Sequence, residues 1–287
     1  MLNKIGVSVA RNGDFVLAEQ RLWEALALAE ATNHTRGIVG AFDHLAEVAW
    51  RQGDFDTALE RYRECLRYAR QQRGKMRDLS TLDSLIGQGK VLMLQERYDE
   101  AAAAFSEGLD VLGAEGNKTD LAYAHSDLSE VAFRKGDYAT AGRHAEESLR
   151  LRQEARNEWG IATAQQQLAQ VAHKRGRPAE ALRRARESLA IFERLQAKRG
   201  LADSLLLVAA IAQDNGDQRV AAQLFGAAEM LLDSRGAQLS QPQRDYYEKA
   251  YLAPARAGLD PQAWAAGRDL SLERAVLLAQ GYAPEEH

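Results

Sequence analysis

The chain has 287 residues, 46% of them hydrophobic and 27% charged, and this composition is typical of a folded protein rather than a disordered one. The net charge of -4 and the isoelectric point of about 5.9 give no reason to expect nucleic acid or an anionic membrane as a partner. A single cysteine, Cys65, excludes an intramolecular disulfide and is typical of a reducing compartment. The sequence has no apolar run of the roughly 18 residues that a membrane span needs and no signal-type core after Met1. We therefore expect a cytoplasmic protein that does not bind a membrane.

One sequence pattern recurs along most of the chain. It centres on a tight turn, and its six anchors are Gly13, Gly53, Glu96, Gly136, Gly176 and Gly216, separated by steps of 40, 43, 40, 40 and 40 residues. The residue five positions after the anchor is alanine in every copy, namely Ala18, Ala58, Ala101, Ala141, Ala181 and Ala221. After each turn, apolar residues follow the i, i+3, i+4 and i+7 spacing of an amphipathic helix. Each copy therefore predicts a hairpin of two helices, in which a left-handed residue ends the first helix.

A single hairpin cannot bury its apolar face, so the copies are expected to stack side by side. The alternation of small and large positions resembles the tetratricopeptide repeat (TPR), in a longer form with a period of about 40 residues. The resemblance implies an all-α fold over residues 1–235, a right-handed superhelix of about six TPR-like hairpins. Ile5 and Gly6 already occupy positions of a first helix. We expect either that the chain is a fragment of a larger regulator or that its first hairpin stacks on another partner.

Residues 236–287 depart from the period and are expected to form C-terminal capping helices. The prolines of this segment are Pro242, Pro254, Pro261 and Pro284. From Pro242 onward the sequence predicts three shorter helices, broken near Gly258 and Gly267, with Ser271 as an N-cap. We expect these helices to cover the apolar face of the last repeat.

Short motifs in the C-terminal part resemble the closing region of large bacterial signal-transduction ATPases, the LuxR-type and related STAND regulators. The matching segments are Leu224 to Glu229, Tyr247-Glu248, and Ala263 to Ala279, which holds Trp264 and Gly267 at a fixed spacing. In that family an ATPase module precedes a TPR superhelix that receives an inducer or a partner protein. The resemblance implies the sensor or interaction region of a bacterial signalling or transcription regulator, with an upstream ATPase module among its partners.

No combination of residues in the sequence predicts an enzyme. The segment GQGK at residues 87–90 shares features with a phosphate-binding loop, but it lacks the first glycine, and Val91 stands where Ser or Thr would hold magnesium. His44 with Glu47 and His144 with Glu147 form H-x-x-E pairs, yet the sequence offers no HExxH motif or further ligands for a metal site. We therefore expect a non-enzymatic protein with no cofactor and no metal.

Residues 174–186 hold six Lys or Arg side chains against the single carboxylate of Glu180. Such a cluster could contact phosphates, but no aromatic residues are interleaved for base stacking. We interpret the cluster as the solvated outer face of a second helix, and nucleic acid is not an expected partner.

Stacked hairpins leave their first helices along a concave face, which is the expected binding groove. The TPR resemblance implies that inward-pointing residues lie at fixed distances before each anchor. The positions carried over to this sequence are Asp43, His44, Glu47, Trp50, Arg51, Lys90, Met93, Tyr123, Asp127, Glu130, Phe133, Arg134, Gln166, Gln170, His173 and Lys174. Aromatic residues and arginines are typical interface anchors, and amides can bond the main chain of a peptide. The alternative for Trp50 and Phe133 is that they pack against the neighbouring repeat.

The expected partner is a protein or peptide bound in this groove. The alternative is a sensor for a small, sugar-like inducer, in which Trp50, Tyr123 and His173 would line the pocket. Acidic Glu47 and Glu130 occupy the slots of the lysine–asparagine clamp by which some TPR proteins hold a C-terminal carboxylate. A receptor for chaperone tails is therefore not expected.

Overall fold

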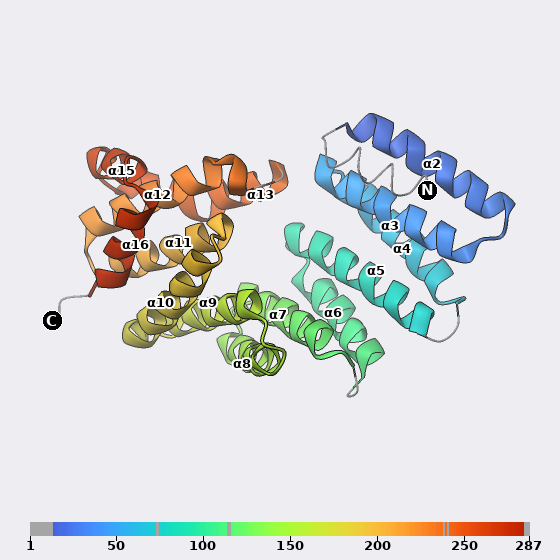
Figure 1. The fold of residues 1–287 in the computed structure, drawn as a ribbon, viewed down its shortest axis with the longest axis horizontal. Helices are drawn as coiled ribbons and strands as arrows, with labels where there is room; N and C mark the ends of the chain where they lie inside the picture. Colours follow the sequence, from blue (N-terminus) through green and yellow to red (C-terminus); the bar gives the residue numbers. More distant parts are fainter. Residues whose placement is uncertain (1–13, 73–74, 114–115, 238, 240, 284–287) are drawn as a thin grey trace. The chain divides into compact units, whose positions relative to one another are not determined.

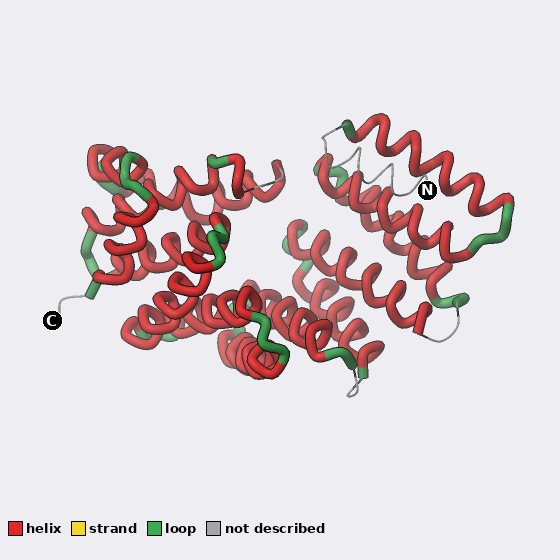
Figure 2. Tube along the Cα trace, in the orientation of Figure 1, coloured by secondary structure: helices red, strands yellow, loops and turns green. Residues whose placement is uncertain are grey.

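The computed structural model describes residues 14–72, 75–113, 116–237, 239 and 241–283. The chain divides into two compact units, unit 1 (residues 1–135) and unit 2 (residues 136–287). Within the described residues every regular element is a helix, and short loops join the helices (Figure 2). The all-α fold of tandem helical hairpins is thus confirmed.

Unit 1 is built from six described helices in chain order (Figure 1). They are α2 (Phe15–Ala31), α3 (Thr35–Gln52), α4 (Phe55–Ala69), α5 (Lys75–Leu94), α6 (Tyr98–Leu112) and α7 (Lys118–Arg134). Helix α3 packs against α2 and α4, α5 against α4 and α6, and α7 against α6. The first helices α3 and α5 also contact each other directly. The anchor Gly13 and the expected helix around Ile5 lie outside the described residues.

Unit 2 begins with further repeat helices and ends in a series of shorter helices. Its repeat helices are α8 (Tyr138–Glu154), α9 (Glu158–Lys174), α10 (Pro178–Arg194), α11 (Lys198–Asp214) and α12 (Gln218–Asp233). The elements that follow are η1 (Arg235–Ala237), α13 (Gln241–Tyr247), the π-helical η2 (Glu248–Leu252), α14 (Ala253–Gly258), α15 (Pro261–Arg268) and α16 (Leu272–Gly281). The break at Gly258 is confirmed, and the Ser271 hydroxyl caps α16 by accepting from the Arg274 amide at 3.3 Å. The π-helical turn, which makes η2 and its neighbours one continuous segment, was not predicted. The division at residue 235 follows the sequence period rather than the two units, and it stays a prediction.

The anchors end the first helices as predicted. Gly53 has a φ of +84°, in the left-handed region where glycine carries no side-chain penalty. The other described anchors share this conformation, including the non-glycine Glu96 at +60°. After two of these turns an aspartate caps the next helix, because the carboxylates of Asp54 and Asp137 accept from backbone amides at 3.1 and 3.0 Å. The glycine of these turns thus ends one helix, and the aspartate that follows it begins the next.

The small positions of the repeat are the points where helices meet. All six alanines five residues after the anchors are completely buried, with 0% exposure. Nine residues after the anchors, Leu22, Tyr62 and Phe105 are also buried, and they fill the space that the alanines leave. Twelve residues after the anchors the sequence has another small residue in every copy. Of these residues only Ala25, in the first copy, stays partly exposed.

The GQGK segment has a packing role. A Cβ atom at Gly89 would lie 2.5 Å from the ring of Phe105 on α6, and one at Gly87 would lie 2.6 Å from the hydroxyl oxygen of Tyr62 on α4. Both glycines lie in the middle of α5, not after a strand. They leave room for two aromatic rings, which explains the motif without a phosphate.

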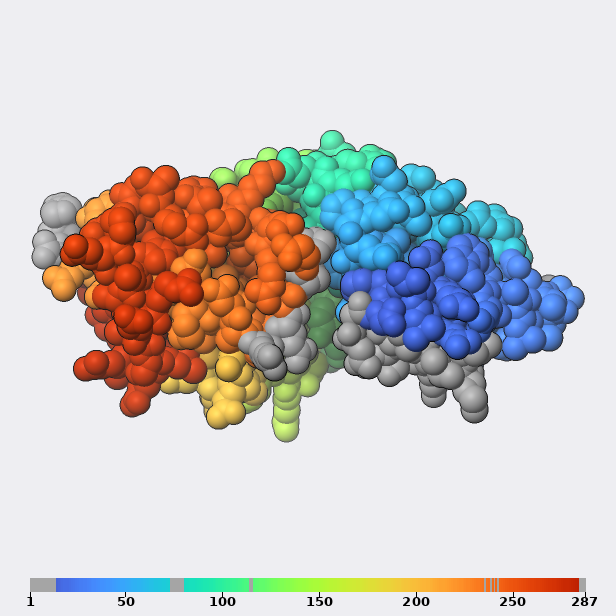
Figure 3. Space-filling view, turned by 90° about the horizontal axis from the view of Figure 1, so that it is seen from above, coloured from blue at the N-terminus to red at the C-terminus, as the bar shows by residue number. Residues whose placement is uncertain are grey.

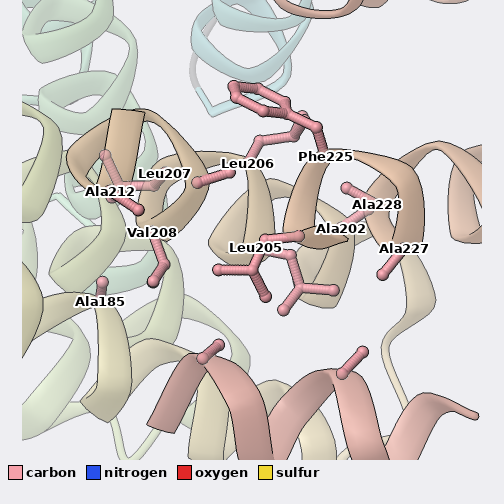
Figure 4. Close-up of a cluster of buried hydrophobic side chains, with 14 of the residues drawn as sticks. Ala185, Ala202, Leu205, Leu206, Leu207, Val208, Ala212, Phe225, Ala227 and Ala228 are labelled. Carbon is pink, nitrogen blue, oxygen red and sulfur yellow. The ribbon is translucent and has the colours of Figure 1, made fainter. Parts of the chain in front are cut away.

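A single cluster of buried side chains runs from α9 to the end of the cap; Figure 4 shows part of it, around α11 and α12. Helix α15 lies very close to α12, since a Cβ at Gly267 would clash with the carbonyl oxygen of Gln223 and lie 2.6 Å from its Cα. Beside this crossing the rings of Phe225 and Trp264 stack with centroids 5.7 Å apart. The motifs that resemble the STAND regulators therefore include the contact residues of the cap.

The cap is also held by polar contacts. The Trp264 indole donates to Glu229 at 2.8 Å, and Glu229 pairs with Arg256 at 2.6 Å and with Arg268 at 2.5 Å. Burial raises the pKa of Glu229, but the hydrogen bonds from Trp264 and Arg268 outweigh it and lower that pKa overall. At the end of the chain, the Tyr282 hydroxyl donates to Asp217 at 2.6 Å.

Candidate functional site

On α3 of unit 1 the predicted inner residues form a partly exposed stripe on a helix that is otherwise largely buried. Asp43, Glu47, Trp50 and Arg51 recur at helical spacing and retain contact with solvent, while Leu45, Ala46, Val48 and Ala49 between them are buried. His44 lies beside Asp43, with its Nδ1 3.7 Å from the Asp43 carboxylate. Burial lowers the pKa of His44.

The next two first helices carry equivalent stripes. On α5 Lys90 is exposed and Met93 is partly exposed. On α7 Tyr123 is 41% exposed, a large fraction for an aromatic residue. The rest of the α7 stripe is partly exposed and consists of Asp127, Glu130, Phe133 and Arg134. The three stripes together are called the unit 1 inner wall.

Two further aspartates, Asp83 of α5 and Asp120 of α7, interact electrostatically with this wall or with each other, and both are counted with the wall. Burial, with the nearby charges of Asp83 and Glu47, raises the pKa of Asp43 to about 7. Burial and the charge of Asp120 likewise raise the pKa of Asp83. Asp43, Asp83 and Asp120 come from α3, α5 and α7, so acidic groups extend across three successive hairpins, and Asp43 keeps its proton up to about pH 7.

The arginines of the wall are already paired with carboxylates. Arg51 donates to Glu47 at 2.7 Å and Arg134 to Glu130 at 2.7 Å, each one helical turn apart. These pairs neutralise the two glutamates and leave the aspartates as the excess charge. The wall is thus acidic, with aromatic and methionine side chains between its charges.

The packing alternative holds in part for Trp50. Its ring and the side chain of Met93 pack on the core cluster that contains Leu59 and Tyr62. Its indole Nε1 is nevertheless buried without a hydrogen-bond partner in the described part of the chain, and so is Nδ1 of His44. Buried polar atoms normally make hydrogen bonds, so the Trp50 indole can donate one to a ligand and Nδ1 of His44 can form another.

Sequence reasoning missed Asp83 and Asp120. Asp83 lies 13 positions before its anchor Glu96, the same offset that selects Tyr123 before Gly136. That offset, applied to every copy, would have found Asp83. Asp120 lies in the first turn of α7, and only the packing of the helices brings it near Asp83.

In unit 2 the predicted residues divide into buried and exposed members. Gln166 is 8% exposed, and its Nε2 has no hydrogen-bond partner among the described residues. Gln170 is partly exposed and Lys174 is exposed. His173 is close to Asp214 of α11, with Nε2 3.1 Å from the carboxylate, and burial lowers its pKa. Helix α9 therefore offers two amides, an imidazole and the exposed cation of Lys174.

The cap covers the inner side of the last repeat. Leu206 and Leu207 of α11, at inner positions of the sequence pattern, are 2% and 6% exposed and belong to the core cluster shared with the cap. The Tyr247 hydroxyl donates to Asp203 of α11 at 2.5 Å. Among the first helices of the unit 2 hairpins, α9 keeps predicted binding residues at the surface, namely Gln170 and Lys174.

Charged side chains of the basic stretch 174–186 and of one H-x-x-E pair form ion pairs within the protein. In the basic stretch, Arg184 pairs with Glu180 at 3.1 Å and Arg183 with Glu187 at 2.7 Å. The Glu147 carboxylate of one H-x-x-E pair binds Arg150 at 2.5 Å. Among the described residues no three His, Cys, Asp or Glu side chains gather as a metal ion would require. No described helix is long and apolar enough to span a membrane.

Solved structures of other repeat proteins have the same fold. BtubC (BKLC) from P. vanneervenii is 21% identical with a TM-score of 0.61, and the match covers 88% of this chain and 94% of that one. The apo form of RapI is 14% identical with a TM-score of 0.66, over 89% of this chain and 96% of that one. The protein PH0952 from Pyrococcus horikoshii, a STAND protein with a tetratricopeptide repeat sensor, is 14% identical with a TM-score of 0.67, over 96% of this chain and 41% of that one. At these identities the likeness shows the fold alone.

A comparison with curated proteins finds no match. A family model described as "Tetratricopeptide repeat" matches residues 38–114, 78–154 and 120–194. These overlapping matches span more than half of the chain, and the chain therefore belongs to the tetratricopeptide repeat family.

Proposed function

We propose that the chain is a non-enzymatic TPR scaffold that binds a protein or peptide on the inner faces of its first helices. One observation carries this proposal: the unit 1 inner wall keeps charged and aromatic side chains at least partly exposed on three successive hairpins, beside buried core residues of the same helices. A stripe that contributed only to stability would be expected to be apolar and covered. TPR proteins generally serve as interaction scaffolds, which supports the same function.

The chemistry of the wall suits a peptide that carries basic and apolar residues. The excess carboxylates of Asp43, Asp83 and Asp120 favour a cationic partner residue, because like charges that already repel one another gain from a neutralising cation. Tyr123, 41% exposed on the same helix as Asp120, offers an aromatic ring of the kind found at interface hot spots.

Within this function we propose that the chain is the sensor or interaction region of a bacterial signalling or transcription regulator, with an ATPase module as a partner in the same system. The cap motifs around Phe225, Trp264 and Gly267 support this assignment, since they resemble the closing region of such regulators. The likeness in fold to PH0952, described as a STAND protein with a TPR sensor, supports it as well. We place the protein in the cytoplasm, in keeping with its free, buried Cys65.

A peptide selection on the intact chain tests the function. Random peptides displayed on phage are selected on the immobilised protein, and the dissociation constant of the best binder is measured by fluorescence anisotropy. The double variant Asp83→Lys/Tyr123→Ala changes an aspartate and the tyrosine of the wall and should weaken binding at least tenfold. Its matched control is Trp159→Ala/Glu193→Lys, an exposed aromatic and an exposed carboxylate outside the predicted set.

The control should bind within about twofold of the unchanged chain, because surface substitutions away from a binding site have small effects. Circular dichroism establishes that both variants are folded. Equal loss in the two double variants, or loss in the control alone, would contradict a binding surface on the inner wall.

A small polar inducer is a second candidate, supported by the buried Trp50 Nε1 and His44 Nδ1, which make no hydrogen bond in the described part of the chain. Hydroxyl groups of a sugar-like ligand would satisfy both atoms. A thermal-shift screen of metabolites tests this, since a ligand at 100 times its dissociation constant adds about 2.7 kcal/mol of stability. The absence of a shift with sugars and nucleotides would count against this candidate and leave the peptide function standing.

A further inference from the structure

Away from the inner wall, unit 1 contains a cavity of about 330 Å³ between its second helices α2 and α4. Trp23, Leu26, Ala27 and Glu30 of α2, Phe42 of α3, and Glu60, Arg61 and Glu64 of α4 line it. Its volume lies at the lower end of the range found for small-ligand pockets. Helix α2, dark blue in Figure 3, lies at the surface of the molecule.

The lining combines an aromatic face with carboxylates. Leu26 and Phe42 are 3% and 6% exposed and form the buried part of the lining, while Trp23 is 38% exposed at its edge. Glu30 and Glu60 form no ion pair with the described residues. The Glu64 carboxylate is engaged by Arg67 at 2.6 Å, outside the set of lining residues. Two unpaired carboxylates thus border an indole ring.

The protein places a cation of its own on this ring. The guanidinium carbon of Arg61 lies 4.8 Å from the centre of the Trp23 ring, a cation–π distance. Arg61 makes no ion pair within the described part of unit 1. The ring face is therefore already shown to accept a guanidinium group, and the carboxylates leave the cavity with an excess of negative charge.

We infer that this cavity is a binding site for an organic cation, a guanidinium or ammonium group on an apolar stem. The cation would lie on the Trp23 ring between Glu30 and Glu60, and its stem would contact Leu26 and Phe42. Carboxylates next to an aromatic face attract such cations by charge and by the ring quadrupole. Arg61 occupies part of the site and is displaced when the ligand enters. This site is separate from the inner wall, and the proposal does not depend on the proposed function.

The same chemistry can come from a free amine or from an arginine or lysine of a protein partner, and two probes distinguish these sources. Agmatine represents the free cation, and the tripeptide N-acetyl-Gly-Arg-Gly-amide represents a protein side chain. Each is titrated into the full chain with ¹⁵N-labelled tryptophan at low salt, where screening is weak. The indole signal of Trp23 among the four tryptophans is assigned with Trp23→Phe.

At least one probe should shift the Trp23 indole signal in a saturable way. Trp23→Leu should weaken binding about two- to fivefold, the range for an exposed cation–π contact, and Glu60→Gln should weaken it as well. Arg61→Gln should tighten binding about threefold or more, because the competing internal cation is gone. Trp159→Leu, at a similarly exposed tryptophan, should leave the affinity unchanged.

The result for Arg61→Gln is the most discriminating. A binding site built by the arginine itself would lose affinity in this variant, and that loss would overturn the proposal. The proposal also fails if neither probe shifts the Trp23 signal, or if Trp159→Leu reduces binding as much as Trp23→Leu does. Trp23 and Arg61 are not buried in the core, so these variants keep the fold, which circular dichroism verifies.

Discussion

Gly267→Ala should detach the cap from the last repeat, because α12 and α15 cross at backbone contact. The added Cβ would clash with the carbonyl oxygen of Gln223 and lie 2.6 Å from its Cα, and neither atom belongs to a side chain that could turn away. Helix α15 must therefore shift, which disturbs the stacking of Trp264 on Phe225 and the 2.8 Å hydrogen bond from Trp264 to Glu229. Overpacking costs about 1–3 kcal/mol, and a stacked aromatic pair contributes about 0.5–1.5 kcal/mol. We expect a total loss of about 3 kcal/mol.

The assay is urea unfolding followed by circular dichroism and tryptophan fluorescence. Gly258→Ala is the matched control in the same cap, since a Cβ there meets nothing within 4 Å. The control should be neutral or more stable by about 0.5–1 kcal/mol, because alanine lowers the entropy of the unfolded chain. A Gly267→Ala variant within about 0.5 kcal/mol of the unchanged chain would refute the close crossing of α12 and α15.

Three further substitutions probe single features of the fold. The raised pKa of Asp43 means that the folded chain keeps a proton that the unfolded chain releases, so stability falls as the pH rises from about 4 to about 7. Asp43→Asn should remove this fall, about 1–2 kcal/mol after allowance for its solvent contact, and an unchanged dependence of Tm on pH would contradict it. Glu229→Gln should cost about 2–3 kcal/mol in urea unfolding, because two arginines lose their carboxylate; no loss would show that Glu229 does not hold the cap. Gln196 has a φ of +52°, so Gln196→Gly should stabilise the chain by about 1 kcal/mol; a lower Tm would disprove strain at this turn.

The repeat pattern could be predicted from the sequence because each of its residues has a local cause. A left-handed turn favours glycine, a helix start favours aspartate, and close helix contact requires alanine, so position in the repeat fixes the role. Gly53, Asp54 and Ala58 show this within six residues of the chain. The same logic identified Ser271 as an N-cap.

The cap and the charge of the inner wall depend on distant residues, and for them the sequence was less informative. Gly226 of α12 lies at the same crossing, because a Cβ there would clash with the carbonyl oxygen of Trp264. Gly267 follows it about 40 residues later, and nothing local in the sequence reveals that the two glycines mark one helix crossing. Asp83 lies at an offset of the repeat that could have identified it, whereas the role of Asp120 depends on the packing that brings α7 near Asp83. Trp50 was predicted as an inner residue, but only the packed helices show that its ring rests on the core while its indole nitrogen stays unpartnered.

The most direct test of the central claim, that the inner wall binds the partner, is a photo-crosslink to the selected peptide. The photoreactive residue p-benzoylphenylalanine replaces Tyr123 on the wall in one variant and Trp159 in the other, at sites that are 41% and 47% exposed. The account predicts that the variant at Tyr123 crosslinks to the peptide and that unlabelled peptide suppresses the reaction. A crosslink at Trp159 with none at Tyr123 would contradict it.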